Sequence, residues 1–468
     1  MSRPNCDKSV LLGALGITAA AAAALLWQAA YPSPAAVLLL GLLALSCSNY
    51  LIGGRDVLYP AFTFTAVWAV VTTAYLFCPI EIRPLGWRTI AILLGGMTSF
   101  SIGSLIGNRA LFQRGHKDRK PEKDVYGDGS QGRLALLGYT VVTIPFVVLD
   151  AQRVSGGNLF TSPAAIIDLR LTMIYMNMSG EQVHSGTFVA TASLIGSLTF
   201  LIFILEERRK WANALCALCM IVLWLVSTGR DFLMRALCWW LCVVLLRKGN
   251  RRFLRFVVPL GVAAVGMVLL MTAFTFLNKS ETQGAGGLQV ATRMTSMYIA
   301  GPIAGFDYAV YNPGEFKEQP EAVFWGVRTL LSKLTIVPAP PPPRFDRGVF
   351  VPFGMNVYTC FKPYYEEFGA VGCFLAFSVI GLIEGQLFYL AINGNHIARF
   401  FFAYLSYALM FGTYDDRYTQ YGYLTAYLYA SLFAFAYFYL LKRLKLRIWG
   451  NRIGFHWLPP RPSITTEG

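Results

Sequence analysis

Twelve apolar runs, each about as long as a membrane-spanning helix, divide the 468-residue sequence. A helix needs roughly 20 apolar residues to cross the hydrocarbon core of a bilayer. The runs cover residues 9–29, 34–52, 59–78, 89–107, 133–149, 186–205, 211–228, 231–247, 253–276, 369–392, 398–414 and 421–441. The sequence therefore predicts an all-α polytopic membrane protein with about 12 transmembrane helices.

The composition excludes several other classes of protein. Hydrophobic residues make up 55% of the chain and charged residues only 14%, whereas a soluble domain carries about 25% charged residues. Intrinsic disorder, a secreted disulfide scaffold and an ordinary cytosolic enzyme are therefore disfavoured. The net charge of +15 does not indicate a nucleic-acid partner, because the basic residues lie mostly in short segments between apolar runs.

These basic segments predict the orientation of the chain in the membrane. With the N-terminus inside, the inner segments hold 25 Lys and Arg against nine acidic residues, and the outer segments hold 15 against 16. Cytoplasmic loops carry the excess of Lys and Arg in membrane proteins. Both termini are therefore predicted to be cytoplasmic.

The lengths of the connections predict the domain organisation. Residues 1–276 are expected to form the first nine transmembrane helices, with a cytoplasmic loop at 108–132 and a periplasmic loop at 150–185. Residues 277–368 are too long for a simple connection and are expected to form a helical periplasmic subdomain. Residues 369–441 are expected to form the last three helices, and 442–468 a basic cytoplasmic tail.

The first candidate cluster of polar residues joins two spans through almost no loop. It contains Arg230, Asp231 and Arg235. Polar residues next to spans are costly and are commonly functional, so a cation held at Arg230 predicts an anionic ligand. The alternative is that Asp231 and Arg235, four residues apart, neutralise each other.

The second candidate cluster leads into the run at 369–392. Its members are Asn356, Tyr358, Lys362, Tyr364, Tyr365, Glu366 and Glu367. Tyrosines at a membrane interface often form an aromatic belt without a specific ligand. A belt does not account for the Asn, the Lys and the two carboxylates. Aromatic faces beside hydrogen-bonding groups are a suitable surface for sugar rings.

The third candidate cluster is a short turn between the last two spans, predicted on the outer side. It contains Asp415, Asp416 and Arg417, which form either a solvated ion-pair turn or a site with a general base. The long outer segment adds basic residues, of which Arg293, Arg328 and Lys333 are candidates for the site; Arg328 and Lys333 lie in an amphipathic stretch.

Together these clusters predict a site for a lipid pyrophosphate at the outer end of the bundle. The planar guanidinium of Arg suits phosphate oxygens better than the ammonium of Lys does. No motif for a metal or another cofactor is evident outside the membrane, so the predicted chemistry needs neither.

Two short motifs resemble the oligosaccharide repeat-unit polymerases, the Wzy-type O-antigen or capsule polymerases. One is Thr228-Gly229-Arg230, which opens a span. The other runs from Asn356-Val357-Tyr358-Thr359 through Pro363-Tyr364-Tyr365 to Phe368-Gly369. The span count and the long outer segment late in the chain also match. An Arg-x10-Gly pattern found in some members is not matched at Arg293.

The resemblance implies a metal-independent glycosyltransferase of the bacterial inner membrane with a GT-C-like helical fold, akin to the O-antigen ligases. It would polymerise undecaprenyl-pyrophosphate-linked repeat units at the periplasmic face, with a chain-length-regulating co-polymerase and a flippase as candidate partners. Arg230, aided by Arg293 or Arg328, would bind pyrophosphate, and Glu366, Glu367, Asp415 or Asp416 would activate the acceptor hydroxyl. Asp231, Arg235, Lys333, Asn356, Tyr358, Tyr364, Tyr365 and Arg417 would bind substrate. The alternatives are an O-antigen ligase and a non-catalytic transporter or flippase.

Overall fold

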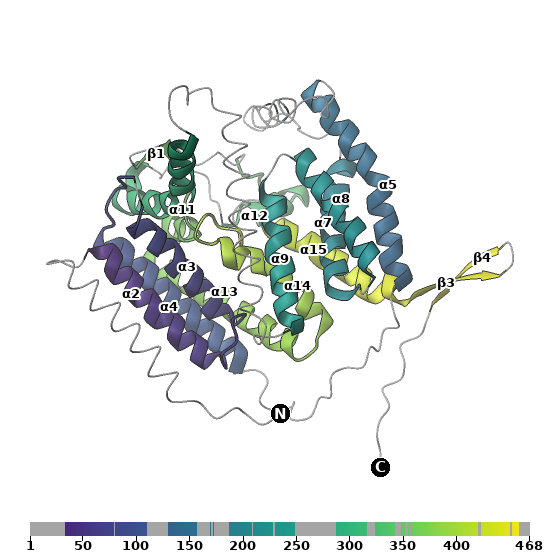
Figure 1. The fold of residues 1–468 in the computed structure, drawn as a ribbon, viewed down its shortest axis with the longest axis horizontal. Helices are drawn as coiled ribbons and strands as arrows, with labels where there is room; N and C mark the ends of the chain where they lie inside the picture. The colour runs from purple at the N-terminus through teal and green to yellow at the C-terminus, as the bar shows by residue number, and fades with distance from the viewer. Residues whose placement is uncertain are drawn as a thin grey trace, which may run out of the picture. The chain divides into compact units, whose positions relative to one another are not determined.

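A computed structural model shows a chain made mainly of α-helices (Figure 1). It describes residues 33–78, 80–109, 130–156, 169, 172, 187–207, 209–227, 230–248, 287–315, 323–341, 348–351, 354–355, 357–419, 423–449 and 452–457. Among these residues, five helices are long and apolar enough to cross a membrane: Pro34–Ile52, Trp87–Asn108, Ser130–Ser155, Phe361–Ile392 and Tyr423–Leu440. The chain is therefore a helical membrane protein.

Most of the predicted spans coincide with helices of the structure. These are α2 (Pro34–Ile52), α3 (Pro60–Leu76), α4 (Trp87–Arg109), α5 (Ser130–Ser155), α7 (Thr187–Glu206), α8 (Lys210–Ser227), α9 (Arg230–Lys248), α13 (Phe361–Ile392), α14 (His396–Phe411) and α15 (Tyr423–Phe435), which a π-helix, η4 (Ala436–Leu440), extends. The predicted spans 9–29 and 253–276 lie outside the described residues. The total of twelve and the location of the termini therefore stay predictions.

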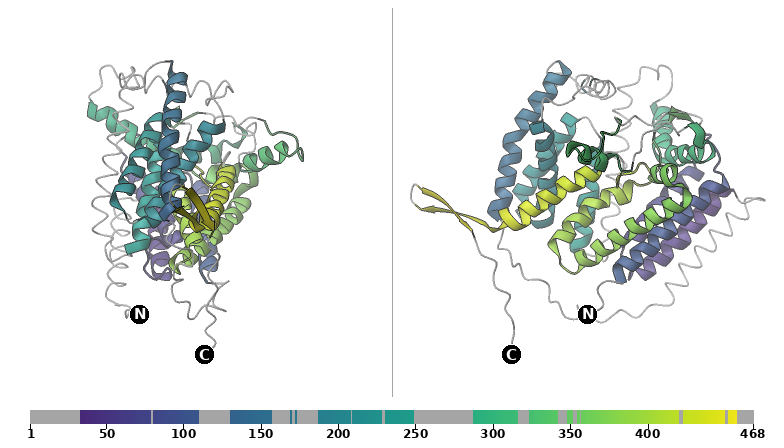
Figure 2. Two further views of the ribbon diagram at one scale, coloured as in Figure 1. Left: turned by 90° about the vertical axis from the view of Figure 1, so that its right-hand side faces the viewer. Right: turned by 180° about the vertical axis from the view of Figure 1, so that it is seen from behind.

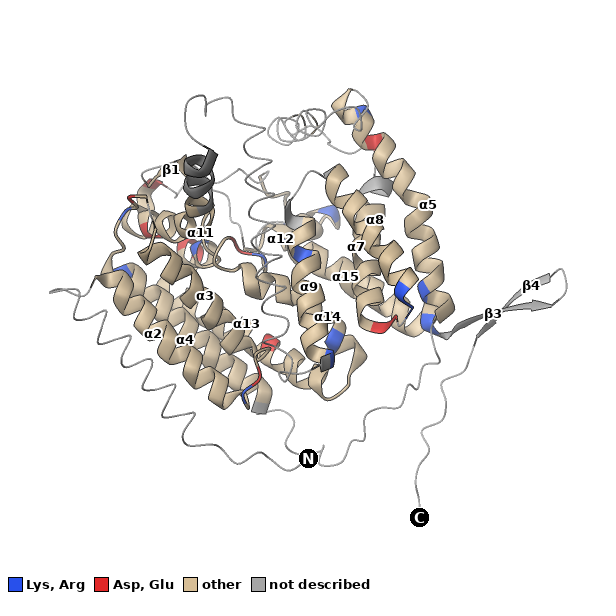
Figure 3. Cartoon of the chain, in the orientation of Figure 1, with Lys and Arg blue, Asp and Glu red and all other residues tan. Residues whose placement is uncertain are grey.

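Charged residues of the described helices lie mainly near the helix ends and in the connections, as Figure 3 shows. This is the arrangement that a bilayer favours, because a charge at its centre is costly. Proline sets the start of two of the spans: Pro34 and Pro60 occupy the first turns of α2 and α3, where the missing N–H removes no helical hydrogen bond.

The chain divides into two compact units. Unit 1 comprises Met1–Arg114, Gly284–Tyr389 and Ala408–Gly422. Unit 2 comprises Gly115–Gln283, Leu390–Tyr407 and Tyr423–Gly468. Figure 2 shows the elements of each unit from two further sides. Residues of the predicted 277–368 subdomain, from Gly284 onward, thus belong to the same unit as α2, α3 and α4.

The first helix of that segment is part of the core of unit 1. The sequence predicts a helix over 288–298, and the structure has α11 over Gly287–Tyr311. Ile303 and Phe306 of α11 are fully buried, and the helix packs against α3 and α4. The second predicted helix, 321–334, corresponds to α12 (Trp325–Lys333). A short 3-10 turn, η3 (Pro313–Glu315), follows α11.

Helices α4 and α13 cross in backbone contact through four glycines. A Cβ added to Gly103 or Gly107 of α4 would lie within 3.0 Å of the carbonyl oxygens of α13. A Cβ on Gly381 or Gly385 of α13 would meet the carbonyls of α4 in the same way. Gly103 faces residues 378–382 and Gly107 faces 382–386, so the two helices run in the same direction. Small residues allow this close approach between membrane helices.

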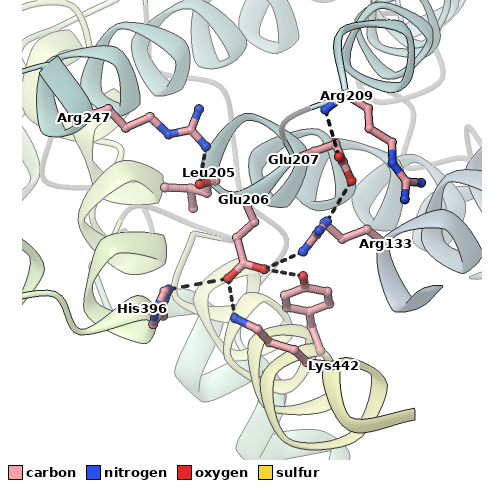
Figure 4. A network of polar contacts seen from close by, with 9 residues as sticks. Arg133, Leu205, Glu206, Glu207, Arg209, Arg247, His396 and Lys442 are labelled. Carbon is pink, nitrogen blue, oxygen red and sulfur yellow. Dashed lines mark hydrogen bonds and ion pairs between the residues drawn. The ribbon is translucent and has the colours of Figure 1, made fainter. Parts of the chain in front are cut away.

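Unit 2 contains a buried ion cluster centred on Glu206, at the end of α7 (Figure 4). The Glu206 carboxylate accepts hydrogen bonds from Tyr437 OH at 2.6 Å, Lys442 Nζ at 2.9 Å and Arg133 Nη1 at 3.3 Å. His396 Nδ1 lies 3.6 Å away. The cluster therefore joins α5, α7, α14 and the segment that follows α15 by charge-assisted contacts.

The neighbouring carboxylate balances the charge of this cluster. Glu207 Oε2 accepts from Arg133 Nε at 2.9 Å, and Glu207 Oε1 accepts from the backbone N–H of Arg209 at 2.9 Å. The side chains of Arg133, Glu207 and Lys442 are at most 6% exposed. Arg247 of α9 reaches the same end of the unit, where it donates to the Leu205 carbonyl (Figure 4).

The all-α prediction misses two small antiparallel pairs of strands. In unit 1, β1 (Val349–Phe350) pairs with β2 (Gly354–Met355). In the predicted cytoplasmic tail, a 3-10 turn, η5 (Leu441–Arg443), leads into β3 (Leu444–Trp449), which pairs with β4 (Arg452–Trp457).

Candidate functional site

Helix α13 is broken at Gly369, where φ is +66° and ψ is −170°. Only glycine adopts this conformation without strain. The rings of Phe361 and Phe377 stack 4.1 Å apart, although residues sixteen apart in a straight helix would be separated by about 24 Å. The segment Phe361–Phe368 therefore folds back along the following part of α13.

This fold-back places non-helical backbone well inside the bundle. A Cβ on Gly96 of α4 would collide with the Phe361 ring, and Gly96 lies about 14 Å along the axis from Trp87, where α4 begins. The preceding residue, Cys360, donates its N–H to the Gly412 carbonyl at 2.8 Å. Residues 357–360 and the turn after α14 therefore meet at this depth.

The sequence predicts that the turn at 413–418 lies on the outer side of the membrane, and this stays a prediction. In the structure the turn starts beside Cys360, within the helix bundle of unit 1. The reason is that α14 ends at Phe411 after 16 residues, or about 24 Å, which is less than the thickness of the hydrocarbon core. Non-helical backbone at membrane depth is tolerated where protein buries it or where it lines a water-filled cavity. Thr359, Cys360 and Asp416 are indeed at most 1% exposed.

Asp416 organises this turn. It is fully buried, and its carboxylate accepts hydrogen bonds from Tyr418 N at 2.9 Å, Thr419 N at 3.2 Å and Thr419 Oγ1 at 2.9 Å. The Tyr364 hydroxyl lies 2.8 Å from Thr419 Oγ1 and 3.5 Å from Asp416 Oδ1. Asp416 thus connects the turn to the fold-back segment.

Asp415 and Arg417 are the more accessible members of the turn. Arg417 Nη2 lies 3.4 Å from Asp415 Oδ2, and the two side chains are 18% and 28% exposed, respectively. Asp415 Oδ1 also accepts the N–H of Asp416 at 2.9 Å. The turn therefore presents one carboxylate and one guanidinium side by side.

The fold-back segment adds a buried cation. The Lys362 side chain is 3% exposed; its Nζ lies 3.2 Å from Glu366 Oε2 and 4.5 Å from the centre of the Tyr358 ring. Arg88 lies over the ring of Tyr365 at 5.8 Å.

Glu367 has a different role in this segment from Glu366. Its Oε1 accepts the N–H of Val323 at 2.8 Å, so it fixes the chain just before α12.

A further carboxylate, which the sequence analysis did not select, holds the connection between α3 and α4. Asp307 of α11 is 1% exposed and accepts from Thr89 Oγ1 at 2.6 Å, Gly86 N at 2.8 Å and Arg83 Nε at 3.2 Å. A single Asp within an apolar helix was the signal available for it. Its three donors keep Arg83 and the start of α4 against α11.

Glu384 is another carboxylate that the sequence analysis did not select. It is fully buried within α13, and its Oε1 accepts from Tyr418 OH at 3.3 Å. Its position inside an apolar run was the available signal. The turn at 412–419 is thus held by two buried carboxylates, Asp416 of the turn itself and Glu384 of α13.

The remaining predicted site residues are distributed as follows. Asn356 and the side chains of Arg230, Asp231 and Arg293 lie outside the described residues; α9 begins at Arg230. Arg235 belongs to unit 2, where its guanidinium carbon lies 5.6 Å from the centre of the Tyr407 ring. Arg328 and Lys333 lie on α12. The structure brings together Tyr358, Tyr364, Tyr365, Glu366, Glu367, Asp415, Asp416 and Arg417 within unit 1.

The fold and this centre define a helical membrane protein with a fold-back segment and a buried polar turn. Comparison of the chain with protein-family models, with curated proteins and with solved structures finds no match.

Replacement of Asp416 is expected to destabilise unit 1. In Asp416→Ala the donors at Tyr418 N, Thr419 N and Thr419 Oγ1 lose their buried acceptor. The free energy of unfolding should fall by an amount on the order of 3 kcal/mol. Thermal unfolding of the detergent-solubilised protein measures the loss. Glu315→Ala, which removes an exposed carboxylate, is the control. Equal melting temperatures for the two variants would contradict this role of Asp416.

Proposed function

We propose that the chain is a glycosyltransferase of the bacterial inner membrane that polymerises undecaprenyl-pyrophosphate-linked oligosaccharide repeat units at the periplasmic face. The observation that carries the proposal is the contact between the fold-back segment and the turn at 412–419. It gathers tyrosines, carboxylates and cations within one unit of a helical membrane protein. Such a group suits a ligand with sugar rings and a diphosphate.

The proposed reaction forms one glycosidic bond and breaks one bond to phosphate oxygen. A hydroxyl of the acceptor repeat unit attacks the anomeric carbon of the donor glycan, and undecaprenyl pyrophosphate leaves with the electrons of the broken C–O bond. A carboxylate takes the hydroxyl proton, and arginines stabilise the negative charge on the leaving diphosphate.

The burial of the carboxylates favours Asp415 as this base. Asp416 is fully buried by its role in the turn, whereas 28% of the Asp415 side chain is exposed. Glu367 accepts a backbone N–H and Glu366 faces Lys362. Arg417, which is paired with Asp415, is the proposed diphosphate ligand of this centre, and Tyr358, Tyr364, Tyr365 and Asn356 are proposed to form the sugar-binding side.

The proposal predicts a ladder of products. Purified protein mixed with lipid-linked repeat units should yield glycans that lengthen by whole units, resolved on a gel. Arg417→Ala should lower the rate by at least about a hundredfold, since it removes charge stabilisation of the leaving group. Arg209→Ala is a matched control, because the Arg209 side chain is exposed and the residue belongs to unit 2.

Other products would identify a different activity. A single transfer to a lipid A–core acceptor, without a ladder, would identify an O-antigen ligase. The absence of any transfer, under conditions in which a known polymerase makes a ladder, would refute the proposed glycosyltransferase activity. A chain-length-regulating co-polymerase and a flippase are proposed partners, and addition of the co-polymerase should narrow the distribution of product lengths.

A transporter of lipid-linked glycans is the second candidate, and two observations favour it. Helix α13 is interrupted at Gly369, and the fully buried Glu384 lies within the same helix. Broken helices and intramembrane carboxylates are typical of transporters. Proteoliposomes loaded with a labelled lipid-linked repeat unit separate the two functions, because a transporter moves the label across the bilayer without lengthening the glycan.

A further inference from the structure

Helix α12 has an apolar stripe that unit 1 leaves exposed. The large apolar residues exposed along and beside this helix are Phe324, Val327, Leu330, Leu334 and Ile336. At about 100° per residue, Val327, Leu330 and Leu334 lie within about 60° of one another around the helix. An exposed stripe of this kind marks a surface that something else covers.

Basic residues border this stripe on both sides. Arg328 lies about 130° and Lys333 about 90° around the helix from the centre of the stripe, in opposite directions. Acidic residues do not occur within α12. Long basic side chains on either edge of an apolar stripe are typical of helices that lie in a membrane interface, where the charged ends reach the lipid phosphates.

The contacts of α12 place it at the end of a membrane-spanning helix. The ring of Phe324, just before α12, lies 6.0 Å from the ring of Phe368, and Val323 N donates to Glu367 Oε1 at 2.8 Å. Phe368 immediately precedes the break at Gly369. The start of α12 is therefore fixed at the level where the long part of α13 begins.

This level is also where an exposed apolar surface of α13 begins. After the break, exposed apolar side chains follow one face of α13 at Val371, Leu375, Val379 and Ile383, and Phe368 is exposed immediately before it. The spacing of four residues forms one stripe about 18 Å long. Since Phe368 contacts Phe324, this stripe continues into the apolar surface at α12.

We infer that α12 is an interfacial helix that lies on the bilayer, with its apolar stripe in the lipid and with Arg328 and Lys333 at anionic headgroups. The continuity with the α13 stripe favours lipid over a protein partner, because one apolar phase covers both surfaces. This inference concerns the surface of unit 1 and holds whether or not the protein is a glycosyltransferase.

Fluorescent labels on α12 test the inference in the full-length protein. The dye NBD is attached to cysteines introduced at Val327, Leu330 and Leu334, on the stripe, and at Thr329 and Ser332, on the other side. Each variant is reconstituted at one copy per lipid nanodisc, and wild-type protein treated with the same dye gives the background from native cysteines. Size-exclusion chromatography selects folded protein.

The expected result is a periodic pattern of burial. Labels on the stripe should emit at shorter wavelength than labels at Thr329 and Ser332. Lipids that carry a spin label at carbon 5 should quench the stripe labels at least about threefold more strongly, since interfacial helices enter the bilayer by about 5–10 Å. Equal quenching at all five positions would overturn the inference. Burial that appears only with two copies per disc would overturn it as well, in favour of a contact between two chains.

The basic residues are tested by lipid composition. Each Lys or Arg near an anionic surface favours binding by about fivefold, so Arg328→Gln with Lys333→Gln should reduce the quenching of the Leu334 label in phosphatidylglycerol discs. The same pair of substitutions should change it little in phosphatidylcholine discs. An equal reduction of quenching in both lipids would show that Arg328 and Lys333 do not bind anionic headgroups.

Discussion

Gly385→Ala should destabilise the protein strongly, although it adds only one methyl group. The added Cβ would lie within 3.0 Å of the Ser104 carbonyl oxygen. That oxygen belongs to the backbone of α4 and cannot rotate away, so the two helices must separate. Overpacking in a well-packed core typically costs 1–3 kcal/mol, and we expect a loss of about 3 kcal/mol here, with a larger loss for Gly385→Val. The melting temperature in detergent and the yield of monodisperse protein measure the effect.

A glycine in open surroundings provides the matched control. Gly138 lies in α5, and a Cβ there meets nothing within 4 Å. Gly138→Ala should therefore leave the protein unchanged or stabilise it by up to about 1 kcal/mol, because Ala favours the helix. If Gly385→Ala and Gly138→Ala have the same melting temperature, the result contradicts a close backbone contact between α4 and α13.

Glu206→Gln should cause the second large loss of stability, by removing the centre of the buried ion cluster of unit 2. Lys442 Nζ lies 2.9 Å from the Glu206 carboxylate, and its side chain is 3% exposed. A buried cation that loses its partner typically costs 3–5 kcal/mol. The free energy of unfolding of Glu206→Gln should fall by about this amount. Glu315→Gln, at an exposed carboxylate, should have little effect on it.

A double-mutant cycle separates the ion pair from general packing. Lys442→Met retains much of the side-chain volume and removes the charge. If the pair is coupled, Glu206→Gln with Lys442→Met should be more stable than the sum of the two single losses predicts, by at least about 1 kcal/mol. Additive losses would show that Glu206 stabilises the unit without its charge contact to Lys442.

Residues that are close in the chain could be predicted from the sequence. The apolar runs gave most of the spans, because the length of a membrane helix follows from the thickness of the bilayer. Predicted and observed starts agree within three residues for α2, α3, α4, α5, α7, α8 and α9. The start of α13 was missed by eight residues, since the fold-back segment Phe361–Phe368 is helical but too short to span.

The contact of α4 with α13 through glycines and the burial of the turn at 412–419 were harder to predict from the sequence. Gly103 and Gly107, and likewise Gly381 and Gly385, have the small-xxx-small spacing that favours close helix contacts, but the spacing alone does not say which helices meet. The candidate residues of the second and third clusters were chosen for their chemistry. That Asp416 is buried by Tyr364 and Thr419, while Asp415 keeps some exposure, depends on how the segments pack.

The sequence by itself determined that this is a helical membrane protein, where most of its described helices lie and which loops are basic, because hydropathy and charge act on each segment separately. Only the tertiary structure decided that Phe361–Phe368 folds back at Gly369, that Tyr364 and Asp416 meet, and that Glu206 gathers Arg133, His396 and Lys442. Those contacts join residues tens to hundreds of positions apart, and they form only when the helices have packed.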